Sequence, residues 1–234
     1  MKLSCVGVSY EVRDLLRDCL VSVSGADEVI VVDNGSRDGS CDMVRREFPE
    51  VRLLERPDNP GFSTAINLAV SHARGDALFL FNPDCVLGDG QLQGLKQRLQ
   101  RYPEVSAFGF RQVDERGAFQ LAHGGPPRLS YELARNLAQR AIDRGWRWPG
   151  RVIDRAYSRP TPVAWIAGSS ILVRREAFDA VEGFDETFFL YFEDIDFCLR
   201  LQADGYKVDY DPTLTVTHRR GESASKNAVA AERG

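Results

Sequence analysis

The sequence lacks a long apolar stretch and the cysteine pairs that mark secreted or zinc-binding proteins. No run approaches the roughly 18 apolar residues of a membrane-spanning helix. Its five cysteines are scattered, and the first apolar run ends at Ser9 and Tyr10, which does not fit a signal peptide. We therefore expect reduced thiols and a cytoplasmic protein, with peripheral attachment to the inner face of the cell membrane left open.

A basic excess is also missing. The formal net charge is -4 at pH 7 over 234 residues, which argues against a nucleic-acid partner. No G-x-G-x-x-G turn or P-loop lysine follows the first apolar run, and this disfavours nicotinamide enzymes and P-loop NTPases. The length suits one large domain.

Short apolar runs alternate with amphipathic stretches through the first half of the chain. The runs predict strands, and the stretches between them carry apolar residues at helical spacing. This alternation predicts an α/β fold, Rossmann-like, with a mostly parallel central sheet and helices on both faces. The predicted strands are Leu3–Val8, Glu28–Val32, Val51–Leu54, Ala77–Phe81 and Val105–Phe110, with helices over Leu15–Val23, Phe62–Val70 and Leu92–Tyr102.

The middle of the chain is rich in arginine. Between Pro126 and Pro160 eight arginines stand against three acidic residues, a local excess of +5, with Trp146 and Trp148 among them. An anionic membrane surface or a lipid-diphosphate acceptor would attract such a segment. A solvated helical insertion is the alternative.

Regular patterns resume after this segment. Val163–Val173 is apolar, Arg175–Val181 predicts a helix, and a further helix begins at Glu193 with three acidic residues in its first turn. A short strand is predicted over Leu214–Thr217. Residues 221–234 have the composition of a flexible tail.

Four motifs carry the chemistry. They are VVDNGSRDGS at Val31–Ser40, NPGF at Asn59–Phe62 followed by Asn67, FNPD at Phe81–Asp84, and the run from Gly183 to Arg200 that contains YFEDID. In this order they resemble the inverting glycosyltransferases of family 2, which have the GT-A fold. The NPD variant and the YFEDID run look most like rhamnosyltransferases of bacterial cell-surface polysaccharide assembly.

This resemblance implies a metal-diphosphate site. A hard divalent cation neutralises the charge of a departing nucleoside diphosphate, and Asp84 at the end of a buried strand can supply an oxygen ligand. His218 is the second expected ligand of Mg²⁺ or Mn²⁺. A plain turn at Asp84 and a structural role for His218 are the alternatives.

The same resemblance makes Asp194 the catalytic base, with Glu193 orienting it or binding the acceptor. Asp33 would accept a hydrogen bond from the nucleotide base, flanked by Ser9 and Tyr10. Asp194 and Glu193 could instead cap the helix, and Asp33 could instead open a turn. The remaining candidates for donor or acceptor contact are Asn59, Gly61, Asn67, Asn82, Trp165, Gly168, Arg200, Arg219 and Arg220.

The predicted reaction is transfer of a sugar, with L-rhamnose from dTDP-L-rhamnose favoured, to a glycan or lipid-diphosphate-linked acceptor. A UDP-hexose donor and a non-catalytic sugar-nucleotide or glycan-binding module are the alternatives. Nucleotidyl transfer is disfavoured because no glycine follows the first strand between Ser9 and Asp14. We expect one domain over 1–220, with a nucleotide-sugar half (1–112), an acceptor half (113–220) and the basic insertion at about 128–160.

Overall fold

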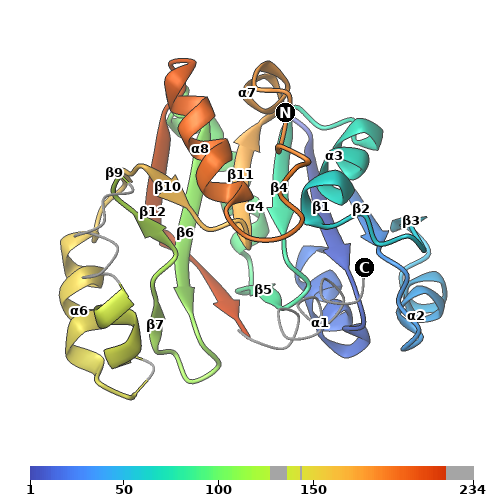
Figure 1. Cartoon of the computed structure of the whole chain (residues 1–234), viewed down its shortest axis with the longest axis horizontal. Helices are drawn as coiled ribbons and strands as arrows, with labels where there is room; N and C mark the ends of the chain where they lie inside the picture. Colours follow the sequence, from blue (N-terminus) through green and yellow to red (C-terminus); the bar gives the residue numbers. More distant parts are fainter. Residues whose placement is uncertain (127–135, 143, 220–234) are drawn as a thin grey trace.

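A computed structural model describes residues 1–126, 136–142 and 144–219 (Figure 1). Arg128, Arg135, Arg220 and the expected tail at 221–234 lie outside the described residues. None of the helices in the described ranges is long and apolar enough to cross a membrane.

Ten of the described strands form one mixed sheet in the order β3-β2-β1-β4-β11-β6-β12-β5, with β7 beside β6 and β9 beside β12. β3, β2, β1 and β4 are parallel, whereas β11 runs antiparallel to β4 and β6. The bounds are β1 (Leu3–Ser9), β2 (Glu28–Asp33), β3 (Arg52–Glu55), β4 (Ala77–Phe81), β5 (Cys85–Leu87), β6 (Ala107–Val113), β7 (Phe119–Gln120), β9 (Thr161–Pro162), β11 (Ser170–Arg174) and β12 (Val208–His218). A small second sheet pairs β8 (His123–Gly124) with β10 (Trp165–Ile166).

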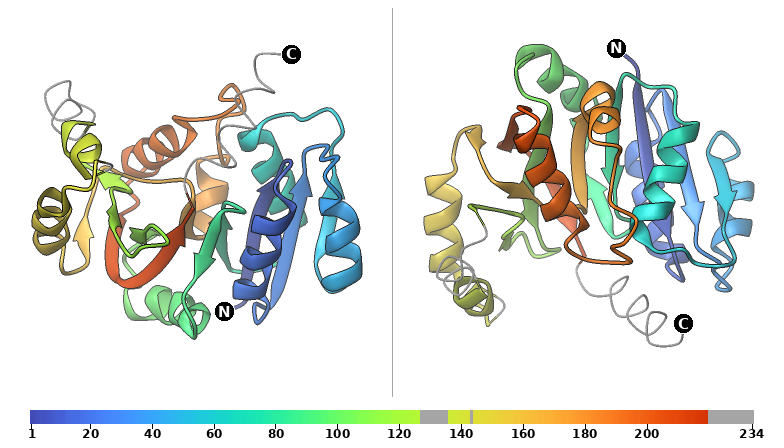
Figure 2. Two further views of the ribbon diagram at one scale, coloured as in Figure 1. Left: turned by 90° about the horizontal axis from the view of Figure 1, so that it is seen from below. Right: turned by 45° about the horizontal axis from the view of Figure 1, so that its top comes forward.

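Helices cover both faces of this sheet (Figures 1 and 2). Val6 and Val8 of β1 pack in the core beneath α3, α7 and α8, while Leu3 and Cys5 pack beneath α1, α2 and α4. This two-residue alternation is why each strand serves two cores, and the α/β prediction is confirmed. The bounds are α1 (Arg13–Val23), α2 (Ser40–Glu47), α3 (Phe62–His72), α4 (Gln91–Arg101), α6 (Arg147–Ala156), α7 (Arg175–Ala180) and α8 (Glu193–Ala203), and residues 136–142 are also helical.

The sheet brings distant parts of the chain to one edge. The carboxyl ends of β1, β2 and β4 lie together, with Ser9 opposite Asp33 in the register. The last strand, β12, pairs antiparallel with β5 and places His218 opposite Cys85. Asp84 and His218 therefore meet although they lie far apart in the chain.

β12 is longer than the predicted strand over Leu214–Thr217. It begins at Val208 and shifts register between Asp211 and Thr215. Two buried aspartates and Pro212 interrupt the apolar pattern there. The pattern alone therefore recognised only the second part of the strand.

Candidate active site

The two predicted metal ligands face each other. Oδ1 of Asp84 lies 3.4 Å from Nε2 of His218, and both side chains are largely buried. Two such groups at this distance are close enough to share a divalent cation. A carboxylate oxygen and an imidazole nitrogen are ligands that suit Mn²⁺. The Cys85 thiol lies within the same cluster. Burial and the Asp84 charge raise the pKa of this thiol well above its usual value, so it stays neutral and is a poor ligand for a hard cation.

A buried amide orients the histidine. Nε2 of Gln112 donates to the hydroxyls of Ser169 (2.6 Å) and Ser170 (3.0 Å), which leaves Oε1 of Gln112 3.0 Å from Nδ1 of His218. In this network Nδ1 carries the proton and donates it to Oε1. The lone pair of the imidazole is therefore on Nε2, toward Asp84. Metal-binding histidines are commonly held in this way by a hydrogen bond on the other nitrogen.

The predicted catalytic carboxylates open α8. The half-buried carboxylate of Asp194 accepts hydrogen bonds from the backbone N–H of Gly168 at Oδ2 and of Ile195 at Oδ1, both at 2.8 Å. A Cβ on Gly168 would lie 3.2 Å from Cβ of Asp194, so the glycine allows this close approach. Gly168 thus positions Asp194 through its backbone.

Glu193 is more deeply buried, with only 6% of its surface exposed. Burial first, and the Asp194 charge second, raise its pKa to about 7. Near neutral pH this carboxyl is therefore partly protonated beside an acidic partner. Pairs of carboxyl groups in unequal surroundings are common in acid–base catalysis.

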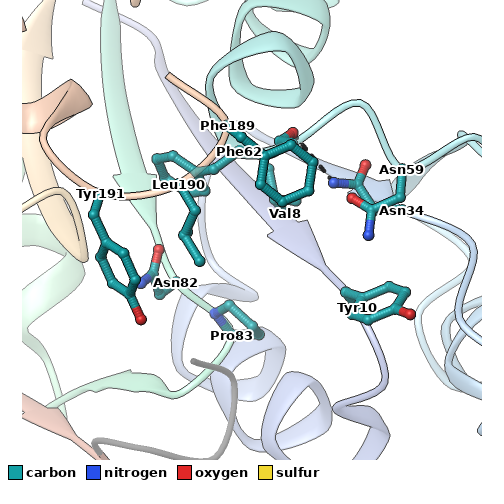
Figure 3. Close-up of a pocket in the computed structure, with 11 residues that line it drawn as sticks. Val8, Tyr10, Asn34, Asn59, Phe62, Asn82, Pro83, Phe189, Leu190 and Tyr191 are labelled. Atoms are coloured by element: carbon teal, nitrogen blue, oxygen red, sulfur yellow. Dashed lines mark hydrogen bonds between the residues drawn. The ribbon is translucent and has the colours of Figure 1, made fainter. Parts of the chain in front are cut away.

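A pocket of about 70 Å³ lies beyond the ends of β1 and β4 (Figure 3). It is lined by four of the predicted binding residues, Tyr10, Asn59, Gly61 and Asn82. In the view of Figure 3, Tyr10 and Asn34 lie toward one end of the pocket, and Asn82 and Tyr191 lie toward the other. This volume corresponds to a few water molecules.

The segment Phe189–Tyr191, here called the strap, accounts for the small size of the pocket because it forms one wall. The backbone N–H of Phe62 donates to the carbonyl of Phe189 at 2.8 Å, which ties the strap to the start of α3. Tyr191 and Phe192 both have φ of +71°, a left-handed conformation that is costly for aromatic residues. The strap thus limits the space at the ends of β1 and β4.

Ser9 and Asp33 are not among the residues that line this pocket. Both are buried, and Oδ1 of Asp33 accepts hydrogen bonds from the backbone N–H of Gly35 (3.1 Å) and Ser36 (2.8 Å). Asp33 thus holds the turn that follows β2. Its predicted contact with the nucleotide base stays a prediction.

Three predicted contact residues, Trp165, Asn67 and Arg200, are not among the residues that line this pocket. The Trp165 ring is only 4% exposed and packs directly on Gly124. The Asn67 amide is bonded to the backbone of Phe184, donating at 2.8 Å and accepting at 3.0 Å. Arg200 pairs with Asp196 and donates to the backbone carbonyl of Val181. Each of these side chains is engaged in packing or bonding the loops around the site, and its predicted contact with donor or acceptor stays a prediction.

Arg219 lies beside the metal residues, but its guanidinium is already paired with Asp18 (2.5 Å) and Glu115 (2.8 Å). Its backbone N–H donates to the carbonyl of Asp84 at 2.9 Å. Arg219 therefore fastens the end of β12 to the loop after β4. Diphosphate contact by Arg219 stays a prediction, and Arg220 lies outside the described residues.

Gln112, Asn34 and the strap were not predicted as parts of the site. Gln112 is a single amide within the otherwise largely apolar strand β6, and that isolation was its one signal in the sequence. Asn34 donates to the carbonyl of Gly61 at 3.2 Å and joins the first two motifs.

Comparison with known proteins identifies the family of this chain. Residues 4–181 match the model of glycosyl transferase family 2, and the chain belongs to this family. It is 32% identical to an N-acetylglucosaminyl-diphospho-decaprenol L-rhamnosyltransferase of Mycobacterium tuberculosis, over 97% of this chain and 79% of that protein. Over 58 residues, 25% of this chain and 22% of the relative, it is 48% identical to the rhamnosyltransferase WbbL of Escherichia coli.

Solved structures confirm the fold as GT-A. The mannosyltransferase PcManGT of Pyrobaculum calidifontis, in complex with GDP-Man and Mn²⁺, has a TM-score of 0.65 at 19% identity, covering 100% of this chain and 64% of that one. GalNAc-T7 with UDP, GalNAc and Mn²⁺ has a TM-score of 0.67 at 15% identity, covering 94% and 44%. The chain is thus a glycosyltransferase related to rhamnosyltransferases.

Proposed function

We propose that this enzyme transfers L-rhamnose from dTDP-L-rhamnose to a glycan carried on a lipid diphosphate, in cell-surface polysaccharide assembly. The observation that carries the catalytic part is the close approach of Asp84 to His218. Asp194 is connected to this region because it accepts the backbone N–H of Gly168, and the next residue, Ser169, accepts the backbone N–H of Asn82 through its carbonyl. The 32% identity to a mycobacterial rhamnosyltransferase over nearly the whole chain supports the donor sugar.

In the proposed reaction the acceptor hydroxyl attacks the anomeric carbon on the face opposite the diphosphate. Asp194 takes the hydroxyl proton as the new carbon–oxygen bond forms. The bond from the anomeric carbon to the diphosphate breaks, and dTDP leaves with the electron pair. The configuration at the anomeric carbon is inverted.

Asp84 and His218 are the residues that would hold Mg²⁺ or Mn²⁺, which when bound neutralises the developing charge on the leaving diphosphate. The neutral Nε2 that faces Asp84 suits this role. Tyr10, Asn59, Gly61 and Asn82 line the pocket for the nucleotide, and Ser9 and Asp33 are buried at the carboxyl ends of the neighbouring strands β1 and β2. The strap closes over the donor once it is bound.

A panel of nucleotide sugars tests the donor. The purified chain is incubated with Mn²⁺ and each of dTDP-L-rhamnose, UDP-glucose, UDP-GlcNAc and GDP-mannose, and the released nucleoside diphosphate is measured. We expect release from dTDP-L-rhamnose above the others. Release from a UDP-hexose alone would contradict the rhamnosyl assignment and favour the alternative donor. No release from any donor, together with no nucleotide binding, would favour a non-catalytic module.

A further inference from the structure

A second and larger cleft, of about 640 Å³, includes His218 in its lining. One wall is the hairpin of β6 and β7, which includes the turn at 114–118, and the opposite wall is α6 with the helical segment before it. The cleft ends at His218 and Arg219. It shares no lining residue with the pocket of Figure 3, so it is separate from the donor pocket and adjoins the same metal pair.

The walls of this cleft are held firmly. Arg111 of β6 pairs with Asp154 of α6 through two hydrogen bonds, of 2.8 and 3.0 Å. Gly150 of α6 packs on Phe119, where an added Cβ would lie at 3.4 Å. Nε2 of Gln120 donates to the backbone carbonyl of His218 at 3.0 Å, which ties the hairpin to the metal-binding strand. The cleft is thus a formed site and not a gap between loose loops.

Its charge is unbalanced. Five arginines and three acidic residues line it. Arg111 is paired with Asp154, Arg219 is paired with Glu115, and Asp114 accepts backbone N–H groups of its own turn. Arg116, Arg147 and Arg151 have no ion pair with any residue that the structure describes. Five arginines against three carboxylates leave a net charge of +2 on the described lining, a local positive field in a chain whose net charge is -4.

The helix that forms one wall has a second exposed stripe. Arg147, Gly150, Arg151 and Asp154 follow helical spacing along the cleft. On the neighbouring face Trp148 and Val152, four residues apart, are 63% and 61% exposed. A row of cations therefore runs beside a row of exposed apolar side chains.

We propose that this cleft binds a diphosphate group carried on an isoprenoid chain, with Arg116, Arg147 and Arg151 contacting the phosphate oxygens. Guanidinium groups bind phosphate through paired, charge-assisted hydrogen bonds. The apolar chain lies along Trp148 and Val152. This inference rests on the proposed function, which needs an acceptor, and it assigns the place where the acceptor's anionic group is held.

The cleft arrangement favours this ligand over a bare anion or a nucleic acid. A free anion would gain nothing from the exposed Trp148 stripe, and a nucleic acid would require a longer basic track than three arginines in one short groove. A diphosphate bound here, beside His218, would direct its attached sugar toward the metal pair and the donor.

Binding measured without donor or metal tests the inference directly. Geranyl diphosphate, inorganic diphosphate and geraniol are each titrated into the full chain in EDTA by calorimetry, so that the metal site contributes nothing. We expect geranyl diphosphate to bind more tightly than either fragment. Arg147→Ala combined with Arg151→Ala should weaken it at least tenfold, since each substitution removes charge-assisted hydrogen bonds. Replacing both arginines by lysine should restore part of the affinity, and this restoration would show that the loss in the alanine variant comes from the missing charge and not from misfolding.

The matched control is Arg155→Ala combined with Arg159→Ala, which removes the same charge from the same region outside the cleft. It should change the affinity less than twofold, and an equal loss in both double variants would overturn the site. Trp148→Ser should weaken the binding of geranyl diphosphate and leave the binding of inorganic diphosphate unchanged. Equal binding of both diphosphates would overturn the isoprenoid part.

Phosphatidylglycerol vesicles test the alternative that the arginines bind lipid headgroups. Arginine-dependent binding to these vesicles without binding of geranyl diphosphate would overturn the inference and assign the surface to lipid headgroups. The donor panel reads release of nucleoside diphosphate without any lipid, so its failure and the failure of the cleft are separate results. A cleft that binds geranyl diphosphate in a chain that rejects dTDP-L-rhamnose would point to another donor.

Discussion

Asp194 and Glu193 are adjacent in sequence, yet the structure gives them unequal surroundings. Asp194 is half-buried and receives two backbone N–H groups, whereas Glu193 is enclosed and its pKa is raised to about 7. A base must reach the acceptor hydroxyl, and the more exposed group is better placed to do so. This is the physical reason for assigning the proton transfer to Asp194.

We predict that Asp194→Asn lowers kcat by about two to four orders of magnitude while dTDP binding changes little, because the amide cannot take the proton. Steady-state rates and nucleotide titrations measure the two effects. Glu193→Gln serves as the neighbouring control and should retain more activity. A larger loss in Glu193→Gln than in Asp194→Asn would move the base to Glu193.

The raised pKa of Glu193 also predicts a pH-dependent stability. The pKa of this carboxyl is 4.5 in the unfolded chain and about 7 in the folded protein, so unfolding releases a proton between these pH values. Stability therefore falls as pH rises from 4.5 to 7. Glu193→Gln removes this loss. The free energy of unfolding of this variant should exceed that of the wild type by on the order of 3 kcal/mol at pH 8, but by little at pH 5. Urea unfolding at both pH values measures it, and an equal difference at both would refute the shift.

Gln112 acts on the metal through His218. We expect Gln112→Leu to weaken Mn²⁺ binding by about 10- to 100-fold, since the Nδ1 proton loses its acceptor and the ring loses its orientation. Calorimetry or the spin resonance of free Mn²⁺ measures the affinity. Gln112→Glu keeps an acceptor and should restore most of it. Gln202→Leu, which removes a glutamine bonded to Ala164 instead, is the control for a general loss of packing.

Among the elements, the strap and the loop before α3 depend on one glycine. Gly61 has φ of +90° and ψ of 179°, a region open almost only to glycine, and an added Cβ would lie 2.7 Å from the carbonyl oxygen of Phe189. Gly61→Ala should therefore cost about 1–3 kcal/mol of stability and displace the strap. Urea unfolding and dTDP titration measure these two effects.

Gly117 offers a comparison, because its φ is also positive, at +73°, but no atom lies within 4 Å of an added Cβ. Gly117→Ala should cost about 1 kcal/mol and leave nucleotide binding as it was. Similar losses of nucleotide affinity in the two variants would show that the strap contact has no part in the donor site.

In the molecule as a whole, one sheet joins residues from both ends of the chain. β11 lies between β4 and β6, and β12 brings His218 to Asp84. A ligand held by the first and last strands should therefore stabilise the whole domain. We predict a single thermal transition whose midpoint rises when dTDP and Mn²⁺ are added together.

His218→Ala should remove most of the Mn²⁺-dependent part of that rise. Calorimetric scans with nucleotide alone, metal alone and both together measure it. Two separate transitions, of which only one moves, would show that the predicted halves at 1–112 and 113–220 unfold independently.

Local patterns in the sequence were sufficient for the α/β fold, most strand and helix positions, and the motifs at Asp84 and Asp194. Apolar periodicity reports which face of an element is buried, and polar residues at the ends of parallel strands meet at one edge whatever the details of packing. The strand over Val208–Asp211 was missed because buried aspartates broke its apolar pattern.

Tertiary structure alone decided which side chains reach the site. Gln112 and His218 are neighbours only because β6 and β12 are paired, and nothing local to either residue reports that pairing. Trp165 and Asn67 resembled contact residues in the sequence, yet packing against Gly124 and bonding to Phe184 engage them. The depth of Glu193, and hence its raised pKa, likewise depends on the surrounding fold, because desolvation is a property of the enclosing atoms and not of the residue itself.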